Sequence, residues 1–292
     1  MTNIHPTLSE DQKALVRSWV NSADECRAQG KYAEAEPLYR QALATAEKVF
    51  GPHHLEVSVV LNNLAVLYKY TGNFDEARQL YERALEITET ALGPAHPSVA
   101  TIYHNLGGLE HARGQYAAGE PFARRSVEIR EQSLGPDHVD VAADIAALAA
   151  ILDGQGKYDE SEPLYQRALA IFERAYGPEH YEIAINLNNL AALKQAQGKR
   201  AEAEQLYRRA LSIKEQVLGA EHPDVAMTLN NLAVLCKANG NYAEAEVLYQ
   251  QALTIFERVF GPQHPKVITC RKNYAGLLRK MNRLAEASAL EA

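Results

Sequence analysis

Six histidines recur at one fixed spacing and are the first residues in the chain that could do chemistry. They stand 42 residues apart, at His54, His96, His138, His180, His222 and His264. Six imidazoles could bind a metal, but zinc needs each ligand nitrogen at about 2.1 Å. Equivalent residues on successive packed helices are separated by at least about 8 to 10 Å. We therefore predict that these histidines close loops and that the protein needs no metal and no cofactor.

Other catalytic patterns are absent from the sequence. It contains no phosphate-binding glycine loop, no nucleophile elbow, no HExxH motif and no DxDxDG calcium loop. The glutamates of the AEAE segments, such as Glu34 and Glu36, would face different sides of a helix and suit solvent better than acid/base catalysis. The three cysteines form no CxxC pair, and Cys26 and Cys236 fall at predicted core positions. The sequence predicts a protein that is not an enzyme.

Asparagines form a second ladder with the same 42-residue step. One position holds Asn21, Asn63, Asn105, Asn189, Asn231 and Asn273, and a second asparagine precedes it at Asn62, Asn188 and Asn230. Asparagine is unfavourable inside a helix unless its amide has a partner. That partner could be the backbone of a bound peptide or a side chain of the neighbouring repeat, and the sequence leaves both interpretations open for the Asn63 series.

Glycines reveal the elements that position these side chains. Two series with the 42-residue step run from Gly30 to Gly240 and from Gly51 to Gly261, which gives two turns and hence two helices per repeat. Stacked helix hairpins bury their apolar stripes against each other. We predict an all-α fold, a right-handed superhelical solenoid of about seven antiparallel helix pairs that forms one domain over residues 1–292. The predicted repeats are 9–51, 52–93, 94–135, 136–177, 178–219, 220–261 and 262–292.

Local signals place the helices within these repeats. Pro97 is expected to be the first residue of a helix that ends near Gly114, because its missing N–H has no intrahelical partner there. Ser9 and Gln12 form a candidate capping box for the first helix. The second helix of the last repeat is expected to be short, from Leu284 to Ala292.

The repeats resemble a known family. Small and large residues alternate as in a tetratricopeptide repeat, at Leu61, Leu64, Ala65, Tyr68, Gly72, Phe74, Ala77, Tyr81 and Ala84. The period of 42 rather than 34 residues, and phrases such as GPAHPSVATIYHNLGGL, are similar to the kinesin light chain type. This resemblance implies a concave groove that binds short acidic peptide segments containing a tryptophan. Because only about a dozen residues precede the first predicted helix, a free-standing relative of the bacterial kind is expected.

The predicted groove carries positive charge although the chain has a net charge of −7. Seven side chains at the concave phases are cationic and two are anionic, which favours an acidic, extended protein or peptide segment as the partner. A solvated face of long lysine and arginine side chains is the alternative interpretation. The predicted binding residues are Asn62, Asn63, Lys69, His104, Asn105, Asn188, Asn189, Asn230, Asn231, Lys237, Lys272, Asn273 and Arg279.

One repeat breaks the asparagine pattern. Ala146 and Ala147 stand where the asparagine pair is expected, which indicates either a pocket for a large side chain of the ligand, or a loosely selected repeat or a hinge.

The expected function is therefore that of a protein-interaction adaptor. The acidic net charge argues against general nucleic-acid affinity, and no segment has the roughly 18 apolar residues of a membrane span. The few cysteines favour a reducing compartment, the cytoplasm. Two alternatives stay open: a sensor arm of a larger signalling protein, and a scaffold that associates weakly with itself through Leu284 and Leu290 of the terminal repeat, with a monomer as the other expected state.

Overall fold

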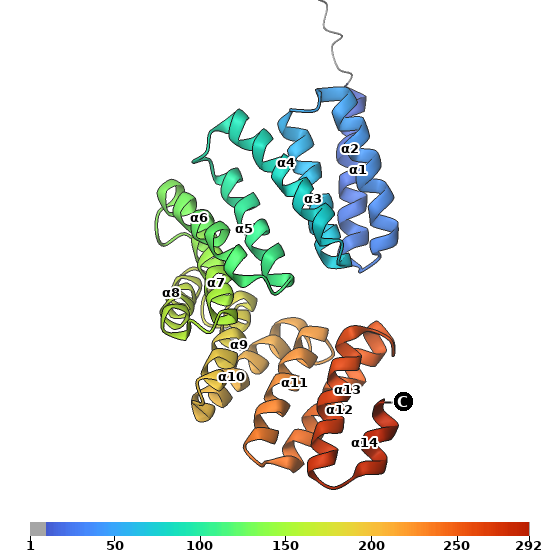
Figure 1. Ribbon diagram of the computed structural model, residues 1–292, viewed down its shortest axis with the longest axis vertical. Helices are drawn as coiled ribbons and strands as arrows, with labels where there is room; N and C mark the ends of the chain where they lie inside the picture. Colours follow the sequence, from blue (N-terminus) through green and yellow to red (C-terminus); the bar gives the residue numbers. More distant parts are fainter. Residues whose placement is uncertain (1–9, 292) are drawn as a thin grey trace, which may run out of the picture. The chain divides into compact units, whose positions relative to one another are not determined.

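The computed structural model describes residues 10–291, and every regular element in that range is an α-helix (Figure 1). The predicted all-α fold of helix pairs is confirmed. The proposed capping residue Ser9 and the last residue, Ala292, lie outside the described residues. The helices are α1 (Glu10–Ala28), α2 (Tyr32–Phe50), α3 (Leu55–Thr71), α4 (Phe74–Leu92), α5 (Pro97–Ala112), α6 (Tyr116–Leu134), α7 (Val139–Gly154), α8 (Tyr158–Tyr176), α9 (Tyr181–Ala196), α10 (Arg200–Leu218), α11 (Pro223–Ala238), α12 (Tyr242–Phe260), α13 (Pro265–Lys280) and α14 (Leu284–Glu291).

The chain divides into two compact units. The N-terminal unit comprises residues 1–157 and contains α1 to α7, and the C-terminal unit comprises residues 158–292 and contains α8 to α14. Each unit has its own large apolar cluster, built in the first around residues such as Leu61 and Tyr81 and in the second around residues such as Leu232 and Tyr249.

Within each unit the helices stack in a regular order. The two helices of a repeat pack against each other, as α5 does on α6, and the second helix also packs against the first helix of the next repeat. Successive first helices also contact each other, namely α1, α3, α5 and α7 in one unit and α9, α11 and α13 in the other. Among the described residues, successive second helices make no such contact. The first helices therefore line the inner, concave side of each unit. We call the solvent-facing surface of these helices the A-helix face; it is formed by α1, α3, α5 and α7 in the N-terminal unit and by α9, α11 and α13 in the C-terminal unit.

The two ladders that defined the repeats have local explanations. Gly72 follows α3 with a left-handed φ of 82°, and its N–H donates to the carbonyl of Tyr68. A β-carbon is strained at that φ, so a glycine ends the helix. The histidine ladder caps the first helices: the backbone N–H of Ser98 donates to Nδ1 of His96 at 3.1 Å, directly before Pro97 begins α5.

The same cap recurs at every histidine of the ladder. Each ring accepts, through Nδ1, the N–H of the residue two positions later, which satisfies one of the unpaired donors of a helix start. The predicted loop-closing role is thus confirmed, for His54, His96, His138, His180, His222 and His264.

Small residues and tyrosines on the second helices build the core as predicted. Ala77 and Tyr81 on α4 are fully buried, and so are Ala245 and Tyr249 on α12. Cys236 is buried as well, and burial raises the pKa of its thiol to about 12, so it packs as an apolar side chain.

The terminal repeat agrees only partly with expectation. Leu284 is 59% exposed, but Leu290 packs against the apolar cluster of the C-terminal unit. Of the two leucines named for self-association, only Leu284 is therefore largely exposed.

Candidate peptide-binding face

The asparagines of the N-terminal unit connect successive first helices. Nδ2 of Asn105 on α5 donates to Oδ1 of Asn62 on α3 at 2.8 Å, and Nδ2 of Asn62 donates to Oδ1 of Asn63 at 3.3 Å. The asparagine at the Asn63 position of one repeat thus donates a hydrogen bond to the asparagine at the Asn62 position of the preceding repeat. All three side chains are partly exposed on the A-helix face.

The C-terminal unit repeats this arrangement. Asn273 on α13 donates to Asn230 on α11 at 3.1 Å, and Asn231 donates to Asn188 on α9 at 3.4 Å. Each side-chain amide has two N–H donors and a carbonyl with two lone pairs, so one or two bonds leave part of its capacity unused. The structure therefore establishes an inter-repeat hydrogen bond for Asn105, Asn231 and Asn273. Each of these bonds fixes the orientation of a side-chain amide whose hydrogen-bonding capacity is only partly used.

Two of the asparagines differ from the others. Asn188 is only 9% exposed and accepts from Thr228 as well as from Asn231, so it is less available than the sequence suggested. Asn189 is partly exposed, and the residue 43 positions before it in the sequence is Ala146 and not an asparagine.

A hollow lies on the A-helix face of the C-terminal unit. It is a cavity of about 470 Å³ between α9, α11 and α13, and its lining includes the predicted residues Asn230, Asn231 and Asn273. Tyr207 also lines it from α10, and the remaining lining residues lie on the first helices, namely Ala192, Gln195, Ala196, Val234 and Thr269. A smaller hollow of about 230 Å³ in the N-terminal unit is lined by Asn62 and by Val59, Thr88 and Thr101, among others.

Two predicted lysines are partly buried on the first helices, Lys69 on α3 and Lys237 on α11. Lys69 lies with its Nζ 5.5 Å from the ring centre of Tyr70, and Lys237 donates to the backbone carbonyl of Asn273 at 3.4 Å. Burial lowers the pKa of Lys69, with Arg27 as a second cause, and burial together with Lys280 lowers the pKa of Lys237. In the part of the chain that the structure describes, neither lysine pairs with a carboxylate, so both are available to an anionic ligand.

The other predicted cations are more exposed. Lys272 and Arg279 lie exposed on α13, and Arg279 forms an ion pair with Glu291 of α14. That pair reduces the charge that Arg279 can offer to a ligand.

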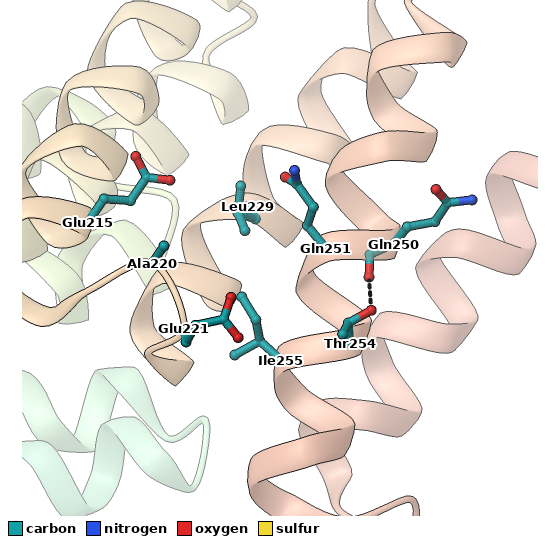
Figure 2. Close-up of a pocket in the computed structure, with 8 residues that line it drawn as sticks. All are labelled: Glu215, Ala220, Glu221, Leu229, Gln250, Gln251, Thr254 and Ile255. Carbon is teal, nitrogen blue, oxygen red and sulfur yellow. Dashed lines mark hydrogen bonds between the residues drawn. The ribbon is translucent and has the colours of Figure 1, made fainter.

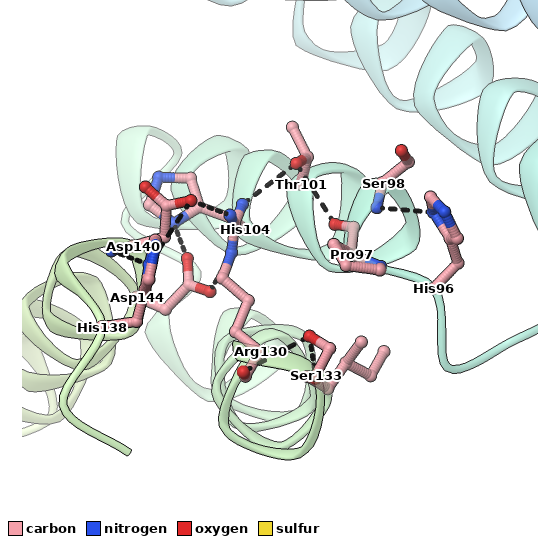
Figure 3. Close-up of polar contacts among 11 residues, drawn as sticks. His96, Pro97, Ser98, Thr101, His104, Arg130, Ser133, His138, Asp140 and Asp144 are labelled. Carbon is pink, nitrogen blue, oxygen red and sulfur yellow. Dashed lines mark hydrogen bonds and ion pairs between the residues drawn. The ribbon is translucent and has the colours of Figure 1, made fainter. Parts of the chain in front are cut away.

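His104 belongs to a polar cluster between three helices of the N-terminal unit (Figure 3). Its Nδ1 lies 2.6 Å from Oδ1 of Asp144 on α7, and Oδ2 of that carboxylate lies 2.6 Å from Nε of Arg130 on α6. Arg130 also donates to the hydroxyl of Thr101 at 3.0 Å. Asp144 is almost fully buried whereas His104 is one-third exposed. The cluster therefore fixes the His104 ring and leaves one edge on the A-helix face.

Comparison with known proteins decides the family. The tetratricopeptide repeat model matches residues 15–90, 98–158, 142–216, 182–258 and 224–292. The chain is a tetratricopeptide repeat protein. The resemblance expected from the repeated residues is therefore confirmed, although no curated protein sequence matches the chain.

Solved tetratricopeptide structures include kinesin light chain types. BtubC (BKLC) from P. vanneervenii is 25% identical over 87% of this chain and 94% of its own, with a TM-score of 0.60. A kinesin light chain-type protein with nearly identical TPR-like repeats from Podosopora anserina is 26% identical over 67% of this chain and 92% of its own, with a TM-score of 0.56. A STAND protein with a tetratricopeptide repeat sensor from Pyrococcus horikoshii shares the fold with a TM-score of 0.67. It is 16% identical over 96% of this chain and 43% of its own.

A further cavity of this tetratricopeptide protein lies off the A-helix face. It has about 320 Å³ and is lined by the end of α10, the loop before α11, and α11 and α12. Figure 2 shows Glu215 and Glu221 on one side of it and Gln250, Gln251 and Thr254 on the other. Glu221 is engaged by Arg258, so this cavity offers less unpaired charge than its composition suggests.

Sequence reasoning missed the polar residues buried between tetratricopeptide repeats. Lys214 on α10 occupies the same repeat position as Arg130, is 2% exposed and donates to Thr228 at 2.9 Å. The signal that could have found both is the appearance of a cation where Phe172 and Phe256 stand in other repeats.

Two general properties of the described residues bear on function. Across residues 10–291 no three histidine, cysteine or acidic side chains are grouped so as to hold a metal ion. None of the helices in this range combines the length and the apolar character that crossing a membrane requires.

Proposed function

We propose that this tetratricopeptide repeat protein is a non-catalytic adaptor that binds an extended, acidic polypeptide segment along its A-helix face. The observation that carries the proposal is the cavity of about 470 Å³ whose lining includes Asn230, Asn231 and Asn273. An extended peptide exposes a carbonyl and an N–H at every residue, and oriented amides with unused capacity pair with both.

Charge supports the choice of an acidic ligand. Lys69 and Lys237 lie partly buried on this face without a carboxylate partner among the described residues. An ammonium group that has already lost part of its hydration gains more from an anion than a fully solvated one. The similarity to kinesin light chain-type proteins agrees with a peptide-binding role, and the cysteine usage favours the cytoplasm.

The test is affinity for fluorescent ten-residue peptides, acidic and basic, with and without a tryptophan, at two salt concentrations. We expect salt-sensitive binding of the acidic peptides, because ion pairs at a partly exposed surface are screened. Thr269→Trp, which fills the cavity from an exposed position, should weaken binding at least tenfold. The matched control is Thr254→Trp in the other cavity, and equal effects of both variants would contradict the proposal.

A second candidate function rests on Leu284. This side chain is 59% exposed on α14, and large exposed apolar residues favour association. As a scaffold the protein would self-associate weakly through this helix. Light scattering of the wild type and of Leu284→Lys should then show a mass that rises with concentration only for the wild type, and a constant monomer mass would remove this candidate.

A further inference from the structure

The first repeat contains a carboxylate that is held by a tyrosine and a cation. The hydroxyl of Tyr39 on α2 donates to Oδ1 of Asp24 on α1 at 2.5 Å, and Nη2 of Arg27 lies 2.9 Å from the same oxygen. Nε of Arg27 also donates to the tyrosine oxygen at 3.0 Å. The three side chains satisfy one another.

The same three positions recur with a different residue in place of the carboxylate. In the second repeat they hold Val66, Lys69 and Tyr81, and in the sixth they hold Val234, Lys237 and Tyr249. The tyrosine and a cation are thus kept at both places, but valine takes the place of Asp24. Each of these sites lies within a single compact unit.

The tyrosines at both places are left without a partner. The hydroxyls of Tyr81 and Tyr249 are buried and make no hydrogen bond, and both residues are 0% exposed. A buried hydroxyl that makes no hydrogen bond is unfavourable and uncommon in folded proteins. Lys237 lies beside its tyrosine, with Nζ 5.9 Å from the centre of the Tyr249 ring. Both hydroxyls therefore have an unused donor, and a cation lies beside the ring of Tyr249. Lys69 occupies the equivalent repeat position near Tyr70, and no carboxylate among the described residues forms an ion pair with either lysine.

Glycines of the following repeat keep space open above the lysines. A β-carbon at Gly108 would lie 3.7 Å from Nζ of Lys69, and a β-carbon at Gly276 would lie 3.5 Å from Nζ of Lys237. A larger side chain at either glycine would occupy the approach to the ammonium group. In the fifth repeat the corresponding tyrosine, Tyr207, lines the cavity on the A-helix face, so this position of the second helix reaches that face.

We propose that Lys69 with Tyr81, and Lys237 with Tyr249, form two subsites that each bind one aspartate or glutamate carboxylate of the bound polypeptide. The carboxylate would take the place that Asp24 holds in the first repeat, accepting a hydrogen bond from the tyrosine hydroxyl and pairing with the lysine ammonium. This inference rests on the proposed peptide-binding function and assigns its acidic preference to four named side chains.

The test supplies the missing carboxylate from within the protein. In the double variant Val66→Asp and Val234→Asp each new carboxylate should occupy its own subsite, as Asp24 does in the first repeat. The probes are a fluorescent ten-residue peptide with four glutamates and its glutamine twin. We expect the affinity for the glutamate peptide to fall at least tenfold and the affinity for the twin to stay within twofold. An unchanged preference for the glutamate peptide would overturn the proposal.

Further variants separate charge from shape and from folding. The double variant Val66→Asn with Val234→Asn introduces side chains of the same size as the aspartates but without their charge. Its affinity for the glutamate peptide should fall less than threefold. The double variant Tyr81→Phe with Tyr249→Phe keeps both cores apolar and removes only the hydroxyls. It should lower the affinity for the glutamate peptide severalfold and leave the affinity for the glutamine twin unchanged. Asp24→Val should vacate the first-repeat site and strengthen binding of the glutamate peptide, and a loss of preference in this variant would contradict the assignment.

A measurement without peptide distinguishes failure of the subsites from failure of the proposed function. Wild type with ring-labelled tyrosines is titrated with sodium acetate, and in a second arm with inorganic phosphate, while the NMR signals of Tyr81 and Tyr249 are followed. Both signals should move with acetate in the wild type and stay fixed in the double aspartate variant. If no peptide binds but acetate moves the signals, the subsites stand and the peptide function fails. If acetate has no effect, or only phosphate acts, the carboxylate subsites are refuted.

Discussion

The carboxylate of Asp144 lies 2.6 Å from Nε of Arg130 and is only 1% exposed. Its other oxygen lies 2.6 Å from Nδ1 of His104, so a buried carboxylate between two tetratricopeptide repeats contacts a guanidinium on one side and an imidazole on the other. Lys214, at the same repeat position as Arg130, meets the neutral hydroxyl of Thr228 instead. The same buried repeat position therefore holds a cation in a direct ion pair at Arg130 and a cation bonded to a neutral hydroxyl at Lys214.

Arg130→Met should destabilise the protein strongly, by about 3 kcal/mol, because it leaves the Asp144 carboxylate buried with only a partly exposed histidine. Lys214→Met should be neutral or stabilising by about 1 kcal/mol, since it replaces a buried cation that forms no direct ion pair among the described residues and whose pKa burial lowers. Urea denaturation followed by circular dichroism measures both. Similar losses of stability in the two variants would show that the ion pair with Asp144 does not determine the cost of removing the cation, which would contradict the prediction.

Asn105→Ala should lower the free energy of unfolding by about 1 kcal/mol, because it removes the 2.8 Å bond to Asn62 between successive first helices. The matched control is Asn189→Ala, at the same repeat position but with Ala146 instead of an asparagine 43 residues earlier. The control should change the free energy by less than about 0.5 kcal/mol. Equal effects would mean that the inter-repeat amide bond contributes nothing measurable.

His264 gives a pH dependence that can be measured. Its Nδ1 accepts the N–H of Lys266 at 3.2 Å, and burial, with Lys266 as a second cause, lowers its pKa. Folding thus favours the neutral ring, so its contribution is complete above the ordinary histidine pKa of about 6.5 and is lost as the pH falls through and below that value. His264→Asn keeps a cap without a titrating ring. The variant should melt with a shallower dependence on pH between about 7 and 5, and an unchanged slope would contradict the cap mechanism.

Glu120 gives a second pH dependence in a more acidic range. Hydrogen bonds from Lys157 and Gln155 lower the pKa of this carboxyl to about 2. A depressed pKa stabilises the fold at pH values above the ordinary glutamate pKa of about 4.3, and this stabilisation is lost as the pH falls from there towards 2. Glu120→Gln should therefore cost about 1.5 kcal/mol at pH 7 and less than about half of that at pH 2.5, as measured by urea denaturation at the two pH values.

The repeat architecture was predictable because each of its causes is local. The turn at position 72 has a positive φ that favours glycine. His96 accepts the N–H of Ser98 and so caps α5, and Pro97 fits the first position of that helix. These constraints involve residues a few positions apart, so their 42-residue recurrence is visible in the sequence and fixes the helix pairs and the family.

The candidate site depended on contacts that the sequence does not contain. Asn105 meets Asn62 because stacking sets the distance between two first helices, and Asn188 is buried for the same reason. The sequence recorded that Val66 replaces Asp24, but not that the Tyr81 hydroxyl is thereby left without a partner. Side chains 12 to 43 residues apart meet only after the repeats have packed. The sequence alone therefore determined the repeat fold and the positions of the polar residues, and the tertiary structure decided which of those polar groups pair with each other and which do not.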